Sequence, residues 1–339
     1  MDWPKTLGKL ADGADLGRTE ARRAMDEIMA GRATPAQAAA FIVALRMKGE
    51  SVDELTGLVE SMRAASVPVH VEGPVVDVVG TGGDRAGTFN ISTAAGIVAA
   101  AAGARVAKHG NRSASSRAGS ADVLEALGYP LDLTPEATAT LIDEVGFGFM
   151  YARNHHPSMR HAAGVRSELG IPTVFNFLGP LTNPAGATNL AIGVSDPDMA
   201  EKMIEVLKNL GASYAFVVFG EDGLDEVSTA APTFIYRLRE GEITHAVFTP
   251  EDFGVDRGSL AEVRGGDAEE NAAIVRSVLD GEPGPRRDIV LVNAAVPIVA
   301  AGLATGFVDG VRVARSVIDD GTAAAKLGAV LALAAELRG

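Results

Sequence analysis

The spacing of apolar residues in the first seventy positions predicts short amphipathic helices. Four apolar residues recur at the i, i+3, i+4, i+7 spacing of one helix face: Ala38, Phe41, Ile42 and Leu45. The preceding Thr34-Pro35-Ala36-Gln37 has the form of a capping box with proline at the first helical position. Gly49 stands where a left-handed C-cap belongs. These signals predict one complete helix between Thr34 and Gly49.

A second capping box, Ser51-Val52-Asp53-Glu54, opens the next predicted helix. Its inward-facing residues are predicted to be Val52, Leu55, Val59 and Met62. The first seventy residues are therefore predicted to form a helical unit.

After Val67-Pro68, runs of β-branched residues alternate with alanine-rich helical stretches. The predicted strands are Val75–Val79, Arg105–Ala107, Phe147–Tyr151, Ala191–Val194 and Tyr214–Phe219. Helices are predicted to begin near Thr93, Ser120, Thr134 and Pro197. This alternation predicts an α/β fold with a mainly parallel sheet, whose ligands bind at the carboxyl ends of the strands. The prolines and asparagines of residues 172–184 indicate a crossing between units rather than a strand.

Residues 289–308 form an uncharged run of membrane-spanning length. Asn293, Pro297, Gly302 and Gly306 interrupt it, so we predict an element buried inside the protein instead.

Composition narrows the function. The 339 residues are 47% hydrophobic and 22% charged, which suffices for a large core and argues against disorder. The sequence has no cysteine, which excludes a disulfide scaffold, a thiolate zinc site and a thiol nucleophile. A net charge of −14 disfavours duplex DNA and anionic membranes as partners. The polar N-terminal stretch lacks a secretory apolar region, so a cytoplasmic location is predicted.

A glycine-rich turn, Gly80-Thr81-Gly82-Gly83-Asp84, follows the first predicted strand and can bring backbone N–H groups close to an anion. It matches neither common nucleotide loop. The dinucleotide pattern would need glycine in place of Arg85, and the Walker pattern lysine in place of Thr88. A tight turn without a ligand remains the alternative for this motif alone.

Two further segments of the sequence favour a phosphate-binding site. Residues 88–93 place three hydroxyls and an amide before a helix, where unpaired N–H groups attract anions, although these residues could be ordinary N-caps. Residues 105–117 contain four basic and no acidic side chains, and Lys108 is predicted to close a strand at the sheet's carboxyl edge. A solvated basic loop is the alternative, with His109 orienting it.

An acidic segment, Glu221-Asp222-Gly223-Leu224-Asp225-Glu226, follows the last predicted strand. Mg²⁺ would relieve the repulsion among its carboxylates, and a solvated turn is the alternative. A glycosidase is disfavoured because Asp225 and Glu226 are adjacent in sequence. Arg166 could grip a carboxylate or lie on the surface. His155-His156-Pro157 lacks useful spacing for metal ligands.

Taken together, these segments resemble the anthranilate phosphoribosyltransferase family, in family order along almost the whole chain. The matching stretches are Gly80–Asp84, Asn90–Thr93, Lys108–Arg112, Ser115-Ser116, Gly119–Asp122, His156-Pro157, Val165-Arg166, Asn176–Pro184 and Gly220–Glu226. The resemblance implies a nucleoside phosphorylase/phosphoribosyltransferase-like fold, in which a smaller all-helical domain is joined by hinges to a large α/β domain. The implied bounds are residues 1–70, with an insertion near 157–185, and residues 71–339. It also implies a homodimer through the helical domains.

The resemblance further implies transfer of the 5-phosphoribosyl group from phosphoribosyl pyrophosphate to the amine of anthranilate, a step of tryptophan biosynthesis. The implied contacts to phosphoribosyl pyrophosphate are Gly80, Gly83, Asp84, Thr88, Asn90, Ile91, Ser92, Thr93, Lys108, His109, Gly110, Asn111, Arg112, Ser113, Ala114, Ser115, Ser116 and Ser120. Ser92 and Glu226 would hold one Mg²⁺, and Asp225 and Glu226 a second. Gly80, Asn111 and Arg166 would contact anthranilate. No acid or base is implied; Lys108, Asn111 and Arg166 would position the reactants.

Three departures from the family pattern bear on inhibitor binding and substrate preference. Phe219 stands where histidine is frequent, Pro172 replaces a usual arginine, and Gly186-Ala187 interrupts a commonly basic segment. Two alternative functions remain open. A nucleoside phosphorylase of the same architecture would carry an extra C-terminal domain, which we do not expect here, and would lack the Asp225-Glu226 segment. A non-catalytic relative that binds nucleic acid would need a broad basic face.

Overall fold

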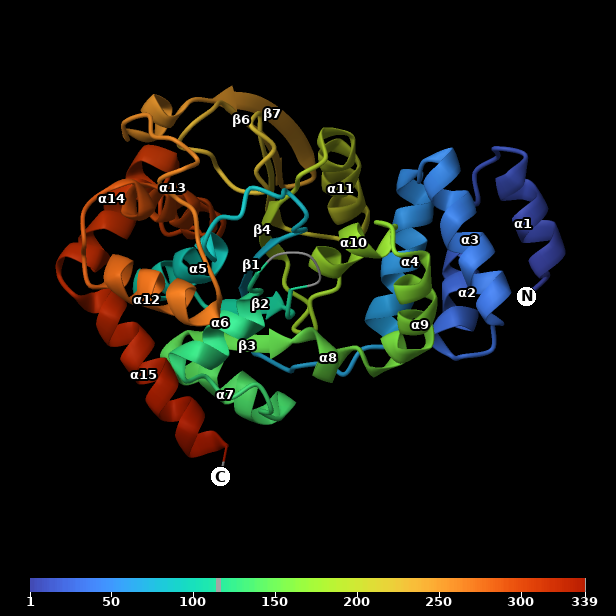
Figure 1. Cartoon of the computed structure of the whole chain (residues 1–339), viewed down its shortest axis with the longest axis horizontal. Coiled ribbons are helices and arrows are strands. Elements are labelled where there is room, and N and C mark those ends of the chain that lie inside the picture. Colours follow the sequence, from blue (N-terminus) through green and yellow to red (C-terminus); the bar gives the residue numbers. More distant parts are fainter. Residues whose placement is uncertain (114–116, 339) are drawn as a thin grey trace.

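The computed structural model describes residues 1–113 and 117–338, so the predicted contacts of Ala114, Ser115 and Ser116 lie outside the described residues. The N-terminal part is a helix bundle (Figure 1). Its helices are α1 (Trp3–Ala11), α2 (Arg18–Met29), α3 (Pro35–Lys48) and α4 (Val52–Ala64). A later helix, α9 (Arg160–Leu169), packs against α2 and α3. The bundle is thus completed by a segment from the middle of the chain.

The capping signals of the bundle are confirmed. Thr34 accepts a hydrogen bond from the backbone N–H of Gln37, whose side chain bonds back to Thr34, and Gly49 ends α3 at a φ of 85°. The predicted face of α3 is buried. On α4, Leu55, Val59 and Met62 are buried, but Val52 is only half-buried because it lies in the first turn of the helix.

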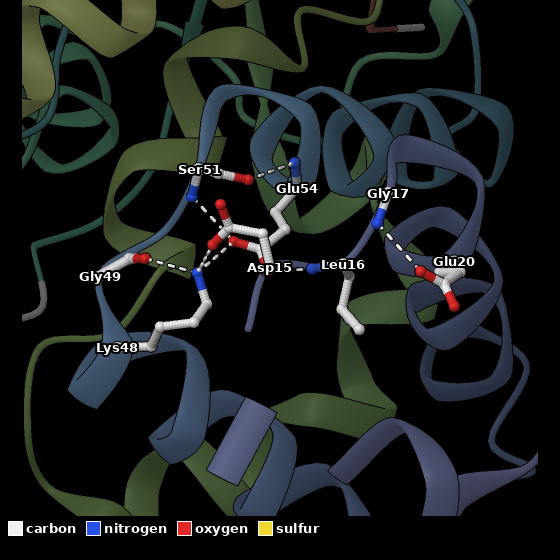
Figure 2. Close-up of polar contacts among 8 residues, drawn as sticks. All are labelled: Asp15, Leu16, Gly17, Glu20, Lys48, Gly49, Ser51 and Glu54. Atoms are coloured by element: carbon white, nitrogen blue, oxygen red, sulfur yellow. Dashed lines mark hydrogen bonds and ion pairs between the residues drawn. The ribbon is translucent and has the colours of Figure 1, made fainter. Parts of the chain in front are cut away.

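A buried carboxylate links the loop between α1 and α2 to the loop between α3 and α4 (Figure 2). Glu54 is 0% exposed and accepts hydrogen bonds from the backbone N–H groups of Leu16 (2.9 Å) and Ser51 (2.8 Å). Lys48 Nζ lies 2.9 Å from Glu54 and 2.5 Å from Asp15. The sequence predicted the capping role of Glu54 but not its burial, because Leu16 and Lys48 are distant in the chain.

We expect Glu54→Ala to destabilise the protein by about 3–5 kcal/mol, because it removes one partner of a buried ion pair and leaves two N–H groups unpaired. Asp15→Asn is the matched control: the Asp15 side chain is 64% exposed, so its loss should cost less than about 1 kcal/mol. Urea unfolding of both variants measures the difference. Equal losses would contradict the assignment of Glu54 as the central acceptor.

A seven-stranded sheet, ordered β3-β2-β1-β4-β5-β6-β7, forms the second part of the described chain. Its strands are β1 (Val76–Gly80), β2 (Val106–Gly110), β3 (Phe147–Tyr151), β4 (Asn189–Gly193), β5 (Tyr214–Gly220), β6 (Thr233–Arg239) and β7 (Glu242–Phe248). Strands β1 to β5 are parallel, and β6 and β7 are added antiparallel. The five predicted strands are confirmed to within two or three residues at their ends.

The β6–β7 hairpin was not predicted from the sequence. Its two-residue turn, Glu240-Gly241, has positive φ at both positions, which suits the twist of a hairpin. Both strands have several exposed side chains, so they lack the continuous apolar run by which the buried strands were identified. Alternation in Thr233–Arg239 was the available signal.

Helices cover both faces of the sheet (Figure 1). Their bounds are α5 (Ile91–Ala101), α6 (Ser120–Leu127), α7 (Pro135–Val145), α8 (Ala152–His155), α10 (Phe175–Leu178), α11 (Pro197–Asn209), α12 (Ala268–Leu279), α13 (Pro285–Ala300), α14 (Phe307–Asp319) and α15 (Thr322–Leu337). Short 3-10 turns cover Pro157–Met159, Gly179–Leu181 and Pro250–Phe253. The helix starts predicted near Thr93, Ser120, Thr134 and Pro197 are confirmed, and residues 172–184 contain no strand.

The strands alternate between two cores because successive side chains point to opposite faces. On β5, Phe216 and Val218 join the core under α5 and α13, whereas Ala215 and Val217 join the core shared with α11 and the helix bundle. The uncharged run at 289–308 is buried only in its first part, Ile289–Ala300, which belongs to helix α13. The rest of the run leaves the helix and exposes Leu303 and Val308, so the prediction of one buried element is wrong for residues 301–308. Within the described ranges, no helix combines the length and apolar character needed to cross a membrane.

Candidate active site

The site lies where the strand order reverses. From β1 the chain proceeds to β2 and β3 on one side, and later returns to place β4 on the other side of β1. In parallel sheets, ligands bind beside the carboxyl ends of the strands at such a point. The glycine turn Gly80–Asp84 leaves β1 there, and Gly80 pairs with Gly193 at the end of β4.

Close approach of Asp225 explains the glycine at both strand ends. A Cβ on Gly80 would lie 2.3 Å from Asp225 Oδ2, and a Cβ on Gly193 would lie 1.5 Å from the Asp225 carbonyl oxygen. The Gly82 N–H donates to Asp225 Oδ2 at 2.6 Å. On the other side, Ser195 Oγ donates to the Gly82 carbonyl at 3.1 Å. The acidic segment, which follows β5, is therefore brought directly against the glycine turn, which follows β1, although β4 separates these two strands in the sheet.

Residues 88–90, which follow the glycine turn, contact residues 263–271 of the later chain. Phe89 N–H donates to the Val263 carbonyl at 3.2 Å, and Asn90 Oδ1 accepts from Asn271 Nδ2 at 2.9 Å. Thr88 forms an isolated antiparallel bridge with Arg264. The side chains of Ile91 and Thr93 are buried, and among the described residues the Thr93 hydroxyl has no hydrogen-bond partner. The expected contact of Thr93 with a ligand stays a prediction.

Lys108 lies inside β2 and does not close it, because the strand continues to Gly110. Its side chain is 1% exposed and lies against β1 and α5. Nζ donates to the Val78 carbonyl, and to Ser92 Oγ at 3.3 Å. Burial lowers the pKa of Lys108 against the opposing effect of nearby Asp77. The ammonium group is thus positioned by β1 and α5 rather than by a loop.

His109 points to the opposite face of β2 from Lys108. Its ring lies 5.1 Å from that of His156, and burial holds its pKa well below the usual value. Its backbone N–H donates to Asp77 Oδ1 at 3.0 Å, and burial raises the pKa of Asp77 to about 6. The expected loop-orienting role of His109 therefore falls to its backbone, while its imidazole stays neutral in the interior.

The loop after β2 folds back onto the start of α6. Asp122 accepts hydrogen bonds from the N–H groups of Gly119 (2.8 Å) and Ser113 (3.2 Å). Burial opposes ionisation, but these donors and Arg112 outweigh it and lower the pKa of Asp122. Ser120 Oγ lies so close to Gly110 that a Cβ there would meet it at 2.2 Å. Asn111 is exposed, and its Oδ1 accepts from Arg112 N–H at 2.8 Å.

The basic segment is less positive than its sequence indicated. Arg112 pairs with Asp122 at 2.6 Å and with Glu125 at 2.8 Å. Arg105 precedes β2, at the far edge of the sheet, and pairs with Asp143. The prediction of an anion site with four free cations is therefore wrong, because three carboxylates from α6 and α7 neutralise two of them. Lys108, by contrast, makes no ion pair among the described residues, and its Nζ donates to the Val78 carbonyl, two residues before the glycine turn.

The acidic segment also divides into two parts. Asp222 accepts from Ser228 Oγ at 2.6 Å and serves the loop, and Glu221 is exposed. The expectation that four carboxylates repel one another is therefore wrong. Only Asp225 and Glu226 are close together, and both lie near Asp84, which belongs to the glycine turn. Burial and then Asp84 raise the pKa of Asp225 to about 7. Burial and then Asp225 raise the pKa of Glu226 well above its usual value.

Arg166 lies near the C-terminal end of α9, as predicted, and Gly170 ends that helix at a φ of 62°. Its guanidinium carbon is 5.1 Å from the centre of the Phe175 ring on α10, and burial lowers its pKa. Within the described ranges its guanidinium has no carboxylate or hydrogen-bond partner. Phe175 therefore orients a cation whose hydrogen-bond donors remain available.

Three polar residues that hydrogen-bond to site segments were not predicted from the sequence: Ser195, Asn271 and Asn293. Ser195 follows a predicted strand, and its position was the available signal. Asn271 and Asn293 lie on helices α12 and α13 and bond to the backbone or side chains of site segments. Asn293 interrupts the apolar run of α13 in the sequence, but its hydrogen-bond partner Val227 is distant in the chain.

Two family models match the chain. Residues 4–66 match the helical bundle domain of a glycosyl transferase family, and residues 72–324 match the a/b domain of a glycosyl transferase family. These ranges agree with the helix bundle and the sheet described above.

Known proteins resemble the chain over nearly its whole length. It is 54% identical to anthranilate phosphoribosyltransferase of Moorella thermoacetica, covering 96% of both chains. A solved structure of anthranilate phosphoribosyltransferase from Thermus thermophilus superposes with a TM-score of 0.92 at 45% identity, covering 98% of this chain and 99% of that one. The Saccharomyces cerevisiae enzyme in complex with PRPP (phosphoribosyl pyrophosphate) and Mg gives a TM-score of 0.91 at 28% identity, covering 98% of both chains.

Proposed function

The chain belongs to the anthranilate phosphoribosyltransferase family, and from this premise we propose how its site performs the reaction. The protein transfers the 5-phosphoribosyl group from phosphoribosyl pyrophosphate to the amine of anthranilate, which yields N-(5-phosphoribosyl)anthranilate and pyrophosphate in tryptophan biosynthesis. The observation that carries the residue assignments is the convergence of the glycine turn, Lys108 and two carboxylates at the switch point of the sheet.

The glycine turn and the segments beside it would bind phosphoribosyl pyrophosphate. Exposed Gly83 presents backbone to the ligand, and Ser92 lies at the N-terminus of α5, where the helix dipole favours phosphate. Asn90 and Thr88 are fixed by contacts to residues 263–271, so they need little reorganisation on binding. Lys108 would place its positive charge where pyrophosphate leaves the ribose.

Asp225 and Glu226, with the Ser92 hydroxyl, fit a magnesium site. The raised pKa of each carboxylate reflects burial and negative neighbours, a cost that a bound cation removes. Mg²⁺ commonly uses one or two carboxylates and completes its shell with substrate phosphates and water. We propose two ions, one at Ser92 and Glu226 and one at Asp225 and Glu226.

When bound, Mg²⁺ supplies charge stabilisation for the departing pyrophosphate. The remaining demand on the protein is to hold two reactants in line. An aromatic amine is neutral near pH 7, so its nitrogen can attack C1 of the ribose without a strong base. Asn111 and Gly80 would bound the space for anthranilate. The nitrogen loses one proton when the C–N bond forms, and the departing pyrophosphate or water can accept it, so no side chain needs to act as a base. Positioning therefore dominates over acid–base catalysis.

Arg166 would bind the carboxylate of anthranilate. We expect Arg166→Ala to raise the KM for anthranilate by about 10–100-fold, because a hydrogen bond between charged groups contributes about 1.5–3 kcal/mol. The KM for phosphoribosyl pyrophosphate should stay close to that of the wild type. Steady-state kinetics with each substrate varied in turn provide the measurement.

Arg160→Ala is the matched control, because Arg160 is an exposed arginine on the same helix. It should leave both KM values unchanged. An unaltered KM for anthranilate in Arg166→Ala would remove this residue from the anthranilate site.

The organisation of the whole protein follows from the same proposal. We place the domain boundary near residue 70, assign residues 157–185 to the helical domain, and expect hinges between the domains. The packing of α9 against α2 and α3 supports this division. We also propose a homodimer through the helical domains, and a cytoplasmic location. A molecular mass of twice that of one chain in analytical ultracentrifugation would support the dimer. The mass of a single chain at all protein concentrations would contradict it.

Loss of anthranilate fluorescence tests the reaction. The decrease in fluorescence should require both phosphoribosyl pyrophosphate and Mg²⁺. Inorganic phosphate should not replace phosphoribosyl pyrophosphate. A phosphorylase would instead cleave a nucleoside with inorganic phosphate. A nucleic-acid-binding relative would retard DNA at physiological salt, which we do not expect from the paired arginines Arg105 and Arg112.

A further inference from the structure

Asn293 is a polar side chain in the otherwise apolar part of α13, and it is only 5% exposed. Its Oδ1 accepts a hydrogen bond from the Val227 N–H at 2.8 Å. Its Nδ2 donates to the Val227 carbonyl at 2.9 Å and to the Ile289 carbonyl at 2.8 Å. The amide therefore binds both polar groups of one peptide residue and is anchored by a third bond to its own helix.

This arrangement uses both N–H groups of the asparagine side chain and its oxygen. The bond to Ile289 lies within α13 and fixes the orientation of the amide. The other two bonds pair the side chain with Val227 as a neighbouring strand would. In the described part of the chain, the N–H and carbonyl of Val227 have no other hydrogen-bond partner. The Val227 backbone is thus hydrogen-bonded only to Asn293 among the described residues, while its side chain is buried in the core.

Val227 directly follows Asp225 and Glu226. Before Val227, the segment is tied to the glycine turn by the bond between Asp225 and Gly82. After Val227, the Ser228 N–H donates to Thr233 Oγ1 at 3.0 Å. Asn293 supplies the restraint between these two attachments. It lies on α13, a helix that packs against β1, β4 and β5, so the position of Glu226 is tied to the central strands.

A restraint is needed because Asp225 and Glu226 are consecutive in the chain and like charges repel each other. Without a fixed backbone at Val227, the segment could relax by moving the side chains apart. A metal site depends on such outer contacts, since the groups that bind the ion must be held at set positions.

We propose that Asn293 is a positioning residue for the reaction, which fixes the Val227 backbone and so places Asp225 and Glu226 to bind the metal. This inference rests on the proposed function, because it assumes that these carboxylates hold Mg²⁺. Asn293 touches neither substrate nor metal. Its effect is therefore expected on metal affinity and turnover, and not on the binding of anthranilate.

Two substitutions test the proposal. Asn293→Leu keeps a similar volume and leaves both groups of Val227 unpaired. Asn293→Asp can still accept from Val227 N–H but cannot donate to either carbonyl. Binding of Mn²⁺, used in place of Mg²⁺, is measured by electron spin resonance with phosphoribosyl pyrophosphate present and anthranilate absent. We expect the Mn²⁺ dissociation constant to rise by about 10–100-fold in both variants. In kinetics, the Mg²⁺ concentration for half-maximal rate should rise while the KM for anthranilate stays within about twofold, as expected when the metal site alone is disturbed.

Val299→Ala is the matched control, since Val299 is a buried residue at the C-terminal end of the same helix and its apolar side chain makes no hydrogen bond to Val227. It should lower Tm and leave Mn²⁺ affinity unchanged. If Asn293→Leu does not fold, Asn293→Ser, which retains one hydroxyl donor, replaces it. A wild-type Mn²⁺ affinity in the folded variants overturns the proposal, as does an equal loss of affinity in Val299→Ala.

The wild-type protein separates this inference from the proposed function. Wild-type protein without Mn²⁺ binding or anthranilate turnover would overturn the proposed function, and with it the basis for this inference. The other outcome concerns Asn293 only. If the wild type binds Mn²⁺ and turns over anthranilate, and the Asn293 variants bind Mn²⁺ with the same affinity, the role of Asn293 is overturned and the proposed function stands.

Discussion

Combined replacement of Asp225 by Asn and Glu226 by Gln is expected to lower kcat/KM by about 1000-fold or more at saturating Mg²⁺. The loss corresponds to about 4 kcal/mol of charge stabilisation, which is typical for removal of a catalytic metal. Both replacements are isosteric, and the amide oxygen introduced at position 225 can still accept from the Gly82 N–H. The glycine turn should therefore keep its shape while the metal site loses its charge. Stopped assays across a range of Mg²⁺ concentrations provide the measurement.

Glu221→Gln serves as the control for this pair, because Glu221 is an exposed carboxylate in the same segment. It should retain wild-type kcat/KM and Mg²⁺ dependence. Since the raised pKa values of Asp225 and Glu226 indicate a destabilising cluster, the double variant without metal should be at least as stable as the wild type. Wild-type turnover in the double variant would show that the metal is held elsewhere.

Lys108→Met should lower kcat/KM by about 100–1000-fold, the usual effect of removing one group that stabilises charge in a transition state. Lys108 is buried against β1 and α5, and its Nζ already donates to Val78 and Ser92. Methionine has similar length, so the main change is loss of the positive charge. The effect should appear in kcat and in the KM for phosphoribosyl pyrophosphate, with the KM for anthranilate little altered.

Lys326→Met is the matched control, because Lys326 Nζ also donates to a backbone carbonyl, that of Val145 at 2.9 Å, but lies on α15. Its kinetics should match the wild type. An equal effect of the two substitutions would mean that Lys108 acts through stability, and an unchanged kcat/KM in Lys108→Met would exclude its proposed role.

Local signals in the sequence predicted much of the fold. The capping boxes at Thr34 and Ser51 and the apolar runs of the buried strands depend on neighbouring residues, so they can be recognised without the tertiary structure. The β6–β7 hairpin was missed because its exposed side chains weaken the apolar pattern. The glycine turn could be placed at a strand end because the strand before it is continuous and apolar.

The electrostatics of the site could not be predicted from local charge. Arg112 appeared free in the sequence, but it is paired with Asp122 and Glu125, which α6 brings back onto the loop. Asp222 appeared equivalent to Asp225, yet Ser228 binds the first and the glycine turn binds the second. These differences arise from contacts made only in the folded chain.

A structure determined with phosphoribosyl pyrophosphate and Mg²⁺ bound tests the central claim most directly. The account predicts metal density at Asp225 and Glu226, with pyrophosphate oxygens between the Gly80–Asp84 turn and Lys108. It predicts no metal at Asp222, which remains bonded to Ser228. Pyrophosphate bound away from the turn, or metal held without Asp225 and Glu226, would contradict it.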